Sequence, residues 1–170
     1  MKMLRAMREP LKYVQGKNAC LEFEKEMGYM GKRFLFVCSN SGYKATHDMI
    51  EQSFEGKGDY YRRYEVFGGI SSNGEINRMK AIVEEDNIDV VVAIGGGSAV
   101  DTAKATAYYA DKRIDNLPTE AATAAPCTGL SVIYNDDGSF DKYLFYPQNP
   151  DAVMVDTQII ANAPVSFLVA

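Results

Sequence analysis

The chain has 170 residues, a formal net charge of −5, three cysteines and one histidine. Its 46% hydrophobic and 24% charged residues are typical of a soluble globular protein, and this length predicts one domain. No apolar run approaches the roughly 20 residues that span a bilayer, and the first residues lack the apolar core of a secretory signal. An acidic chain without a basic block is a poor candidate for binding nucleic acid.

The cysteines and the histidine narrow the classes of site further. Cys20, Cys38 and Cys127 are odd in number and far apart, which favours reduced thiols and a cytoplasmic location. Their spacing does not suit a zinc site, so we expect Cys38 and Cys127 to be small core or loop residues. His47 is the only histidine, which excludes a site built on several histidines of this chain, and we expect it on a helix surface.

Apolar strand-like runs alternate with segments of helical period, and this alternation predicts an α/β fold. The run at residues 33–38 is continuously apolar, as is typical of a strand covered on both faces of a parallel sheet. Ser72 or Asn73 has the chemistry of a helix N-cap. The first half is therefore expected to contain a helix over 19–30, a strand over 33–38, a helix over 44–54, a strand over 61–67 and a helix from 72 or 73 to 86.

The clearest segment lies in the middle of the chain. A β-branched strand over residues 88–94 leads into Gly95-Gly96-Gly97-Ser98, and an alanine-rich helix over 99–111 follows directly. Free amides at such a helix N-terminus can receive phosphate oxygens, and glycine permits the close approach that a Cβ would block. Taken alone, the triple glycine is equally compatible with a tight turn that binds nothing, and it does not match G-x-G-x-x-G.

Beyond Pro118 the pattern changes to shorter elements. Residues 119–129 form a loop of small side chains, and Asn135-Asp136-Asp137-Gly138 predicts a turn between two strands of a β-hairpin, at 130–134 and 143–146. A short strand over 152–155 follows, and Asp156-Thr157 can cap a final helix that stops near Pro164. No linker or repeat interrupts the chain, so one domain is expected over residues 1–170.

Several segments resemble a known family. Residues 94–104, IGGGSAVDTAK, resemble the signature of the iron-containing (group III) alcohol dehydrogenase superfamily. Segments along nearly the whole chain, in order, narrow the resemblance to the glycerol dehydrogenase-like branch; they are KYVQG at 12–16, APC at 125–127, LSVIY at 130–134, YLF at 143–145, VDT at 155–157 and LVA at 168–170.

The resemblance implies an N-terminal nucleotide-binding domain with a Rossmann-like, mostly parallel sheet flanked by helices, followed by an all-helical metal domain. Members move a hydride reversibly between a small-molecule alcohol and NAD, while zinc or iron polarises the substrate oxygen. In the family, Gly-Met-Gly-Asp follows the segment that ends here at Ala170; its Asp and two later histidines are the metal ligands. We therefore expect a fragment or a natural truncation that is inactive alone, lacks the divalent metal and self-associates through an exposed apolar face.

Individual residues match the family's cofactor site. The pyrophosphate-binding turn corresponds to Gly95, Gly96, Gly97 and Ser98. Asp101 matches a position used in NAD binding, although an Asp in a first helical turn also complements the helix dipole. Positions that contact the nucleotide or line its nicotinamide side correspond to Thr119, Thr128, Leu130 and Tyr134. Without the resemblance, Thr119 reads as a loop hydroxyl and Tyr134 as a half-buried strand residue.

Two departures concern the ligands. The family's glycerol type has Asp where this chain has Ser39, so the contact with the adenine ribose is weakened and both NAD and NADP stay open. Ala124 stands where the family's substrate-contacting Asp lies, which weakens specificity for glycerol. The loop with Ala121-Ala122-Thr123 and Thr128 also resembles a 2-hydroxycarboxylate reductase-like branch. A non-catalytic nucleotide-binding or assembly module is the third hypothesis.

A further departure lies at residues 113–117, where the family has an apolar buried strand. Burying Asp115 or Asn116 unpaired would cost roughly 1–3 kcal/mol or more each. The sequence leaves three alternatives, which are an edge strand, local pairing of the polar groups, or a fold that is poorer at this point.

Overall fold

The computed structural model describes residues 8–167. Its centre is a six-stranded sheet in which every neighbouring pair is parallel. The strand order is β1-β8-β5-β4-β2-β3. The strands are β1 (Lys12–Gly16), β2 (Arg33–Cys38), β3 (Tyr61–Val66), β4 (Val90–Gly95), β5 (Arg113–Pro118) and β8 (Ala152–Asp156).

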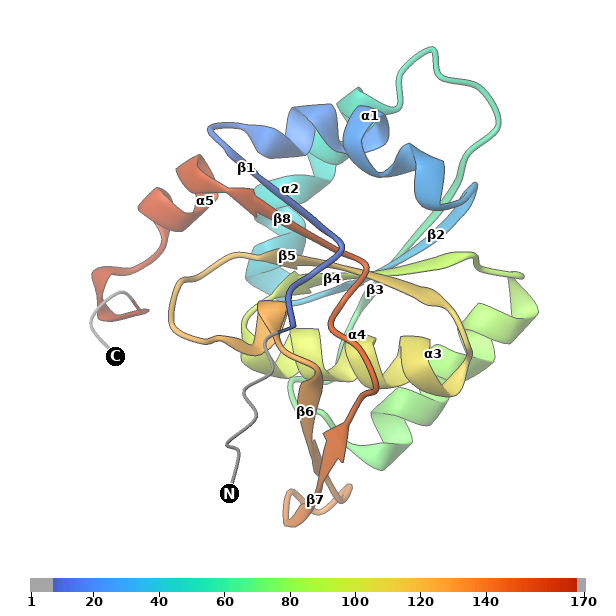
Figure 1. Ribbon diagram of the computed structural model, residues 1–170, viewed down its shortest axis with the longest axis vertical. Helices are drawn as coiled ribbons and strands as arrows, with labels where there is room; N and C mark the ends of the chain where they lie inside the picture. The colour runs from blue at the N-terminus through green and yellow to red at the C-terminus, as the bar shows by residue number, and fades with distance from the viewer. Residues whose placement is uncertain (1–7, 168–170) are drawn as a thin grey trace, which may run out of the picture.

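Helices cover both faces of this sheet (Figure 1). On one face, α1 (Phe23–Met27) and α2 (Asn40–Ser53) pack against a core that includes Phe34 and Phe36. On the other face, α3 (Asn73–Glu85) and α4 (Gly97–Tyr109) bury Leu35 and Val91. Alternate residues of β2 and β4 thus enter different cores, which explains why both strands are continuously apolar. The predicted Rossmann-like α/β fold is confirmed.

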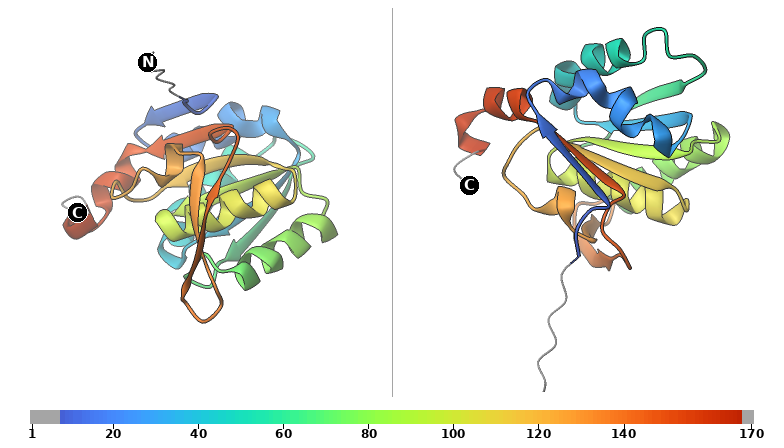
Figure 2. Two further views of the ribbon diagram at one scale, coloured as in Figure 1. Left: turned by 60° about the horizontal axis from the view of Figure 1, so that its bottom comes forward. Right: turned by 45° about the horizontal axis from the view of Figure 1, so that its top comes forward.

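The predicted β-hairpin is also present and extends from the body of the domain (Figure 2). Strands β6 (Leu130–Tyr134) and β7 (Phe140–Phe145) pair antiparallel, and Gly138 has a φ of +84° in the connecting turn. A left-handed φ of this kind favours glycine, as the turn sequence predicts. The base of the hairpin packs along α4.

The first half differs from the expectations in three places. The expected helix over 19–30 is divided into a 3-10 helix (Ala19–Glu22), α1 and a second 3-10 helix (Gly28–Met30). Helix α2 begins four residues earlier than expected because Ser39 is its N-cap and accepts from the amide of Gly42 at 3.0 Å. Strand β1 was not expected, since five residues with alternating burial at a sheet edge give a weak pattern.

The other caps agree with the sequence. The Ser72 hydroxyl accepts from the Glu75 amide at 3.2 Å and begins α3. Asp156 is the N-cap of the short helix α5 (Thr157–Asn162), and its side chain accepts from the amide of Gln158 at 3.0 Å. Both caps satisfy amides that lack partners within their own helices.

Strand β5 resolves the question raised by its polar residues. It lies between β4 and β8, so it is not an edge strand. The Nδ2 of Asn116 donates to the carbonyl of Pro126 at 2.8 Å, but the Asn116 Oδ1 and both carboxylate oxygens of Asp115 have no hydrogen-bond partner among the described residues. Asn116 is therefore partly paired, and Asp115 is a local conflict in the middle of the sheet.

Candidate functional site

The site lies where two central strands end at the same edge of the sheet. From β2 the chain crosses outward to β3, and from β4 it crosses in the opposite direction to β5. The amide of Ser39, just after β2, donates to the carbonyl of Ile94 in β4 at 2.8 Å. A reversal of this kind leaves a crevice at the carboxyl ends of the strands, where α/β folds bind ligands.

The glycine turn follows β4 at this crevice. Gly95 has a φ of +152°, and a Cβ placed on it would lie 2.9 Å from the Cβ of Ala99. This crowding requires glycine there. Gly96 is the N-cap of α4 and offers no side-chain cap, whereas α2, α3 and α5 are each capped by a side chain. The first amides of α4 are thus free to bind an anion, which the helix dipole also favours.

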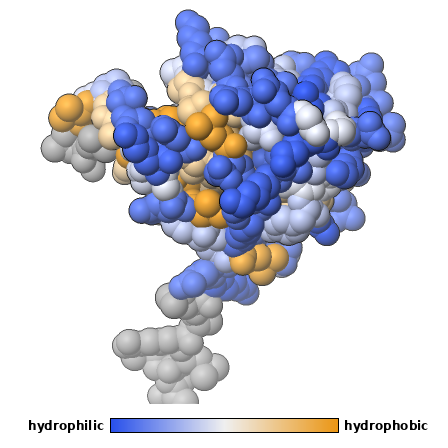
Figure 3. All heavy atoms as spheres, turned by 90° about the horizontal axis from the view of Figure 1, so that it is seen from above, coloured by the Kyte–Doolittle hydropathy of each residue, from blue (hydrophilic) through white to orange (hydrophobic). Residues whose placement is uncertain are grey.

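A cavity of about 480 Å³ opens beside this turn. It lies between the start of α2, represented by Ser41 and Ala45, the segment after β5, represented by Thr119, and the end of α5 with Asn162. The amide of Thr119 donates to the carbonyl of Gly95 at 3.2 Å and so ties this wall to the turn. Figure 3 shows apolar atoms gathered in the hollow beside the C-terminal segment. The volume is within the range of small-ligand sites.

A second cavity of about 240 Å³ adjoins the first on the side of β8. Thr123, Cys127 and Val155 contribute to its lining, and Thr123 also lies over the turn, 3.7 Å from a Cβ placed on Gly97. Glu120 lines both cavities.

The structure brings together only part of the residues expected at the cofactor. The glycine turn lies at the carboxyl ends of β2 and β4, and Ser98, Ser39 and Thr119 lie beside it. Asp101, Thr128, Leu130 and Tyr134 lie instead along the flank of α4 that faces the hairpin. Of all the residues expected at the cofactor, only Thr119 lines one of the two cavities. The assignment of all these residues to the cofactor, those at the glycine turn included, stays a prediction.

Asp101 has structural partners in this arrangement. Its Oδ2 accepts from the amide of Val132 at 3.1 Å, and its Oδ1 lies 3.3 Å from the Nζ of Lys104. Its carboxylate therefore fastens the hairpin to α4. Tyr134 is half-buried, and its amide donates to the carbonyl of Ser71 at 2.9 Å.

Lys104 ends the motif at residues 94–104, and the motif alone assigns it no role. It is only 3% exposed, and its Nζ donates to the carbonyls of Ala125, Thr128 and Leu130. Burial lowers its pKa, while the nearby Asp101 opposes that shift. The signal in the sequence was a lysine inside an otherwise small and apolar helix. Its role here is to hold the loop over 125–130 against α4.

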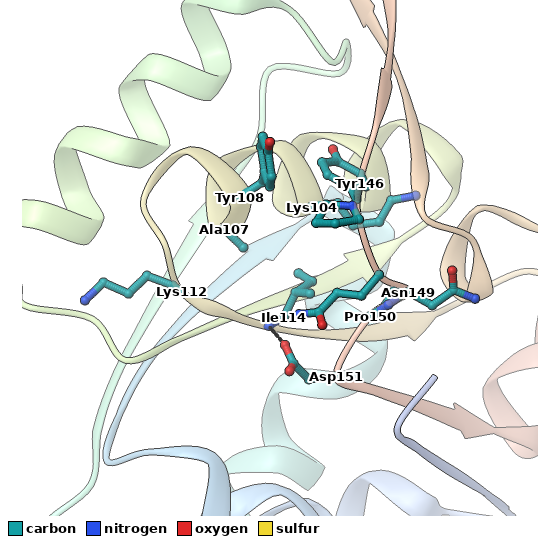
Figure 4. Close-up of a pocket in the computed structure, with 11 residues that line it drawn as sticks. Lys104, Ala107, Tyr108, Lys112, Ile114, Tyr146, Asn149, Pro150 and Asp151 are labelled. Atoms are coloured by element: carbon teal, nitrogen blue, oxygen red, sulfur yellow. Dashed lines mark hydrogen bonds between the residues drawn. The ribbon is translucent and has the colours of Figure 1, made fainter. Parts of the chain in front are cut away.

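A small pocket of about 90 Å³ lies beyond Lys104, toward the C-terminal end of α4 (Figure 4). Tyr108 and Tyr146 flank it on one side, and Asp151 lies across from them and accepts from the amide of Ile114 at 2.9 Å. It shares no lining residue with the two cavities at the glycine turn. We therefore regard it as separate from the candidate site.

Residues 8–167 contain no cluster of three histidine, cysteine or acidic side chains that could hold a metal ion. His47 is half-buried on α2, where its ring packs between those of Tyr43 and Tyr64. Cys38 is a core residue, as expected, and the half-buried Cys127 ends a short 3-10 helix (Ala125–Cys127) before β6. Within the same range, no helix is long and apolar enough to cross a bilayer.

Comparison with known proteins decides the family. The family model described as iron-containing alcohol dehydrogenase matches residues 10–157. The chain belongs to the iron-containing alcohol dehydrogenase family. This confirms the resemblance carried by the glycine turn and by the segments around it.

Similar proteins within the iron-containing alcohol dehydrogenase family include several glycerol dehydrogenases. That of Thermotoga maritima is 45% identical over 161 residues, which cover 95% of this chain and 43% of the relative. That of Citrobacter freundii is 40% identical, with 99% and 46% covered. The structure of a probable glycerol dehydrogenase from Sinorhizobium meliloti superposes with a TM-score of 0.87 at 35% identity, covering 97% of this chain and 44% of that one. The chain thus spans about half the length of these relatives.

Proposed function

We propose that this chain binds NAD at the carboxyl ends of β2 and β4, as the nucleotide-binding part of a metal-dependent oxidoreductase that acts on a glycerol-like alcohol. One observation carries the proposal. Helix α4 is the only helix of the described chain longer than ten residues that begins without a side-chain cap, and it begins at a glycine turn beside a cavity of about 480 Å³. Free amides and an apolar cavity suit the diphosphate and the adenosine of a dinucleotide.

The residues present fit this cofactor. The amides of Gly97, Ser98 and Ala99 would donate to the diphosphate, since no side chain caps them. Thr119 and the end of α5 would enclose the adenosine in the larger cavity. Bound NAD supplies the hydride acceptor, and the chain orients it. Ser39 offers one hydroxyl where the ribose would lie, so either NAD or NADP suits this position.

The alcohol substrate and the metal are proposed for the whole enzyme, of which this chain represents only a part. The names of the relatives, glycerol dehydrogenase above all, support a polyol substrate. The described residues supply no set of metal ligands, so they do not form the family's zinc or iron centre by themselves. We assign to this chain the binding and orientation of the nucleotide, and we expect it to associate with copies of itself.

Calorimetric titration of the chain with NAD, NADH and ADP-ribose tests the proposal. Gly97→Val is the decisive variant, because a Cβ at Gly97 meets nothing closer than 3.7 Å in the protein but its branches would cover the anion-binding amides. We expect at least a tenfold loss of affinity for all three ligands. Gly16→Val is the matched control, since a Cβ on Gly16 has no neighbour within 4 Å. Absence of binding by the unmodified chain would leave only the non-catalytic assembly module.

A 2-hydroxycarboxylate substrate is the second candidate. It is favoured by Ala124, which is exposed in the loop beside the turn and offers no carboxylate that would repel an anion. Hydroxycarboxylate dehydrogenase A of Escherichia coli is 38% identical over 105 residues, which cover 62% of this chain. Competition binding tests both candidates. In this experiment glycerol and a 2-hydroxy acid compete for the same site on the complex of the chain with NADH.

A further inference from the structure

Glu120 occupies an unusual place in the candidate site. Among the described residues it is the one that lines both the cavity of about 480 Å³ and the cavity of about 240 Å³. Its carboxylate also lies directly over Gly96, because a Cβ placed on Gly96 would be 2.8 Å from the Glu120 Cδ. The side chain therefore forms the wall between the cavities and fills the space that the missing Cβ of Gly96 leaves open.

The carboxylate of Glu120 has no fixed partner. No hydrogen bond or ion pair to it occurs within residues 8–167, whereas Glu51 pairs with Arg62 at 2.9 Å and Glu75 pairs with Arg78 at 2.8 Å. Nothing but packing and the dipole of α4 thus holds it over the turn. A side chain held in this way can rotate away without breaking a specific contact.

The same place is needed by the diphosphate. Glycine at position 96 admits phosphate oxygens to the amides of α4, but the Glu120 carboxylate brings a negative charge to that surface. Two like charges a few ångströms apart repel each other, and the repulsion is strongest where water is partly excluded. A ligand that spans the two cavities must displace the side chain that separates them.

From this geometry we infer that Glu120 is a charged gate over the glycine turn. In the free protein it occupies the position of the diphosphate, and in the complex it rotates out and joins the two cavities. It selects against ligands with a diphosphate by their charge, and its effect on adenosine, which lacks phosphate, is small. This inference rests on the dinucleotide site proposed above and deepens it.

The test is the affinity of Glu120→Gln for ADP-ribose and for adenosine. Glutamine keeps the size of the side chain and removes its charge, so we expect ADP-ribose to bind about tenfold more tightly and adenosine to change less than twofold. The gain should shrink in 0.5 M salt, because screening weakens the repulsion in the unmodified protein. Glu85→Gln, at an exposed position near the end of α3, makes the same change in net charge and should leave both affinities unaltered.

The outcomes separate this inference from the proposed function. Equal affinity of Glu120→Gln and the unmodified chain for ADP-ribose, with binding present in both, overturns the gate and leaves the dinucleotide site standing. An equal gain for adenosine also overturns it, because the effect would not depend on phosphate charge. If neither the chain nor any variant binds ADP-ribose, the proposed function and the gate both fail.

Discussion

Asp156 at the end of β8 and Asp115 in the middle of β5 are both completely buried, on neighbouring strands of the same sheet, yet their surroundings are opposite. The Asp156 carboxylate accepts from the amides of Asn18 and Cys20, both at 3.1 Å, and from two amides that begin α5. Neither oxygen of Asp115 has a hydrogen-bond partner within residues 8–167. A buried carboxylate stabilises a fold when donors surround it and destabilises it when they do not.

The difference follows from position along the strand. Asp156 lies where β8 ends, and free amides from the start of the first 3-10 helix and from the start of α5 converge there. Asp115 lies within the ladder, where the backbone amides of β4 and β8 are already paired with carbonyls. The interior of a central parallel strand therefore offers no free hydrogen-bond donor to a buried carboxylate. The ends of the strands do offer free donors.

The largest effect is expected from Asp156→Ala. The substitution leaves four amides without an acceptor, two of them in the segment over 18–20 and two in α5, and we expect a loss of roughly 3–5 kcal/mol in the free energy of unfolding. Urea denaturation followed by circular dichroism measures it. Asp156→Asn keeps one acceptor oxygen and should lose less. A loss below about 1 kcal/mol for the alanine variant would contradict the comparison.

Lys104 extends the comparison to a buried cation whose Nζ has an acceptor for each of its three hydrogens. Lys104→Met keeps the length of the side chain but removes three donors and leaves the Asp101 carboxylate without its ion pair. We expect a loss of roughly 2–4 kcal/mol, with faster amide exchange in β6 than elsewhere because the hairpin is released. Lys80→Met, at an exposed pair on α3, is the control and should change stability by less than about 0.5 kcal/mol. Unchanged exchange in β6 would show that Lys104 does not anchor the hairpin.

Asp115→Val is expected to have the smallest of the three effects on the free energy of unfolding, and it is the only one of the three that increases it. Burial raises the pKa of Asp115 to about 7; the Asn116 amide and Lys12 act in the opposite direction, and the nearby Asp151 carboxylate adds to the rise. The folded-state pKa of Asp115 lies above its unfolded-state pKa. The free-energy cost of the buried charge is therefore absent below about pH 4, grows as the pH rises toward 7 and is complete above pH 7. The valine variant should therefore be more stable by roughly 2–3 kcal/mol at pH 8 and by less at pH 4, where it removes only an unpaired neutral carboxyl.

Thermal or urea unfolding of both proteins across this pH range measures the difference. Asp59→Asn is a useful control, because Asp59 is exposed and is not among the groups that shift the pKa of Asp115. A gain from Asp115→Val that does not depend on pH would show that packing, and not the buried charge, distinguishes β5 from its neighbours.

Much of the local structure was determined by the sequence. The apolar runs of β2 and β4, the glycine turn before α4, the hairpin turn at Gly138 and the caps Ser72 and Asp156 are local signals, because each depends on the periodicity, conformational freedom or hydrogen bonding of a few adjacent residues. The family could be recognised from the same segments, since its motif at 94–104 is contiguous. The α/β class followed from the alternation of elements.

The tertiary structure alone decided which residues meet. Strand order placed β5 in the centre of the sheet and so made Asp115 an unpaired group, and it brought Ser39 beside the turn at Gly95. Glu120 follows Thr119 in an irregular loop, and no periodicity indicates that its carboxylate lies over Gly96. Contacts between segments far apart in the chain depend on how strands are ordered and how loops pack, and neither is encoded in the spacing of neighbouring residues.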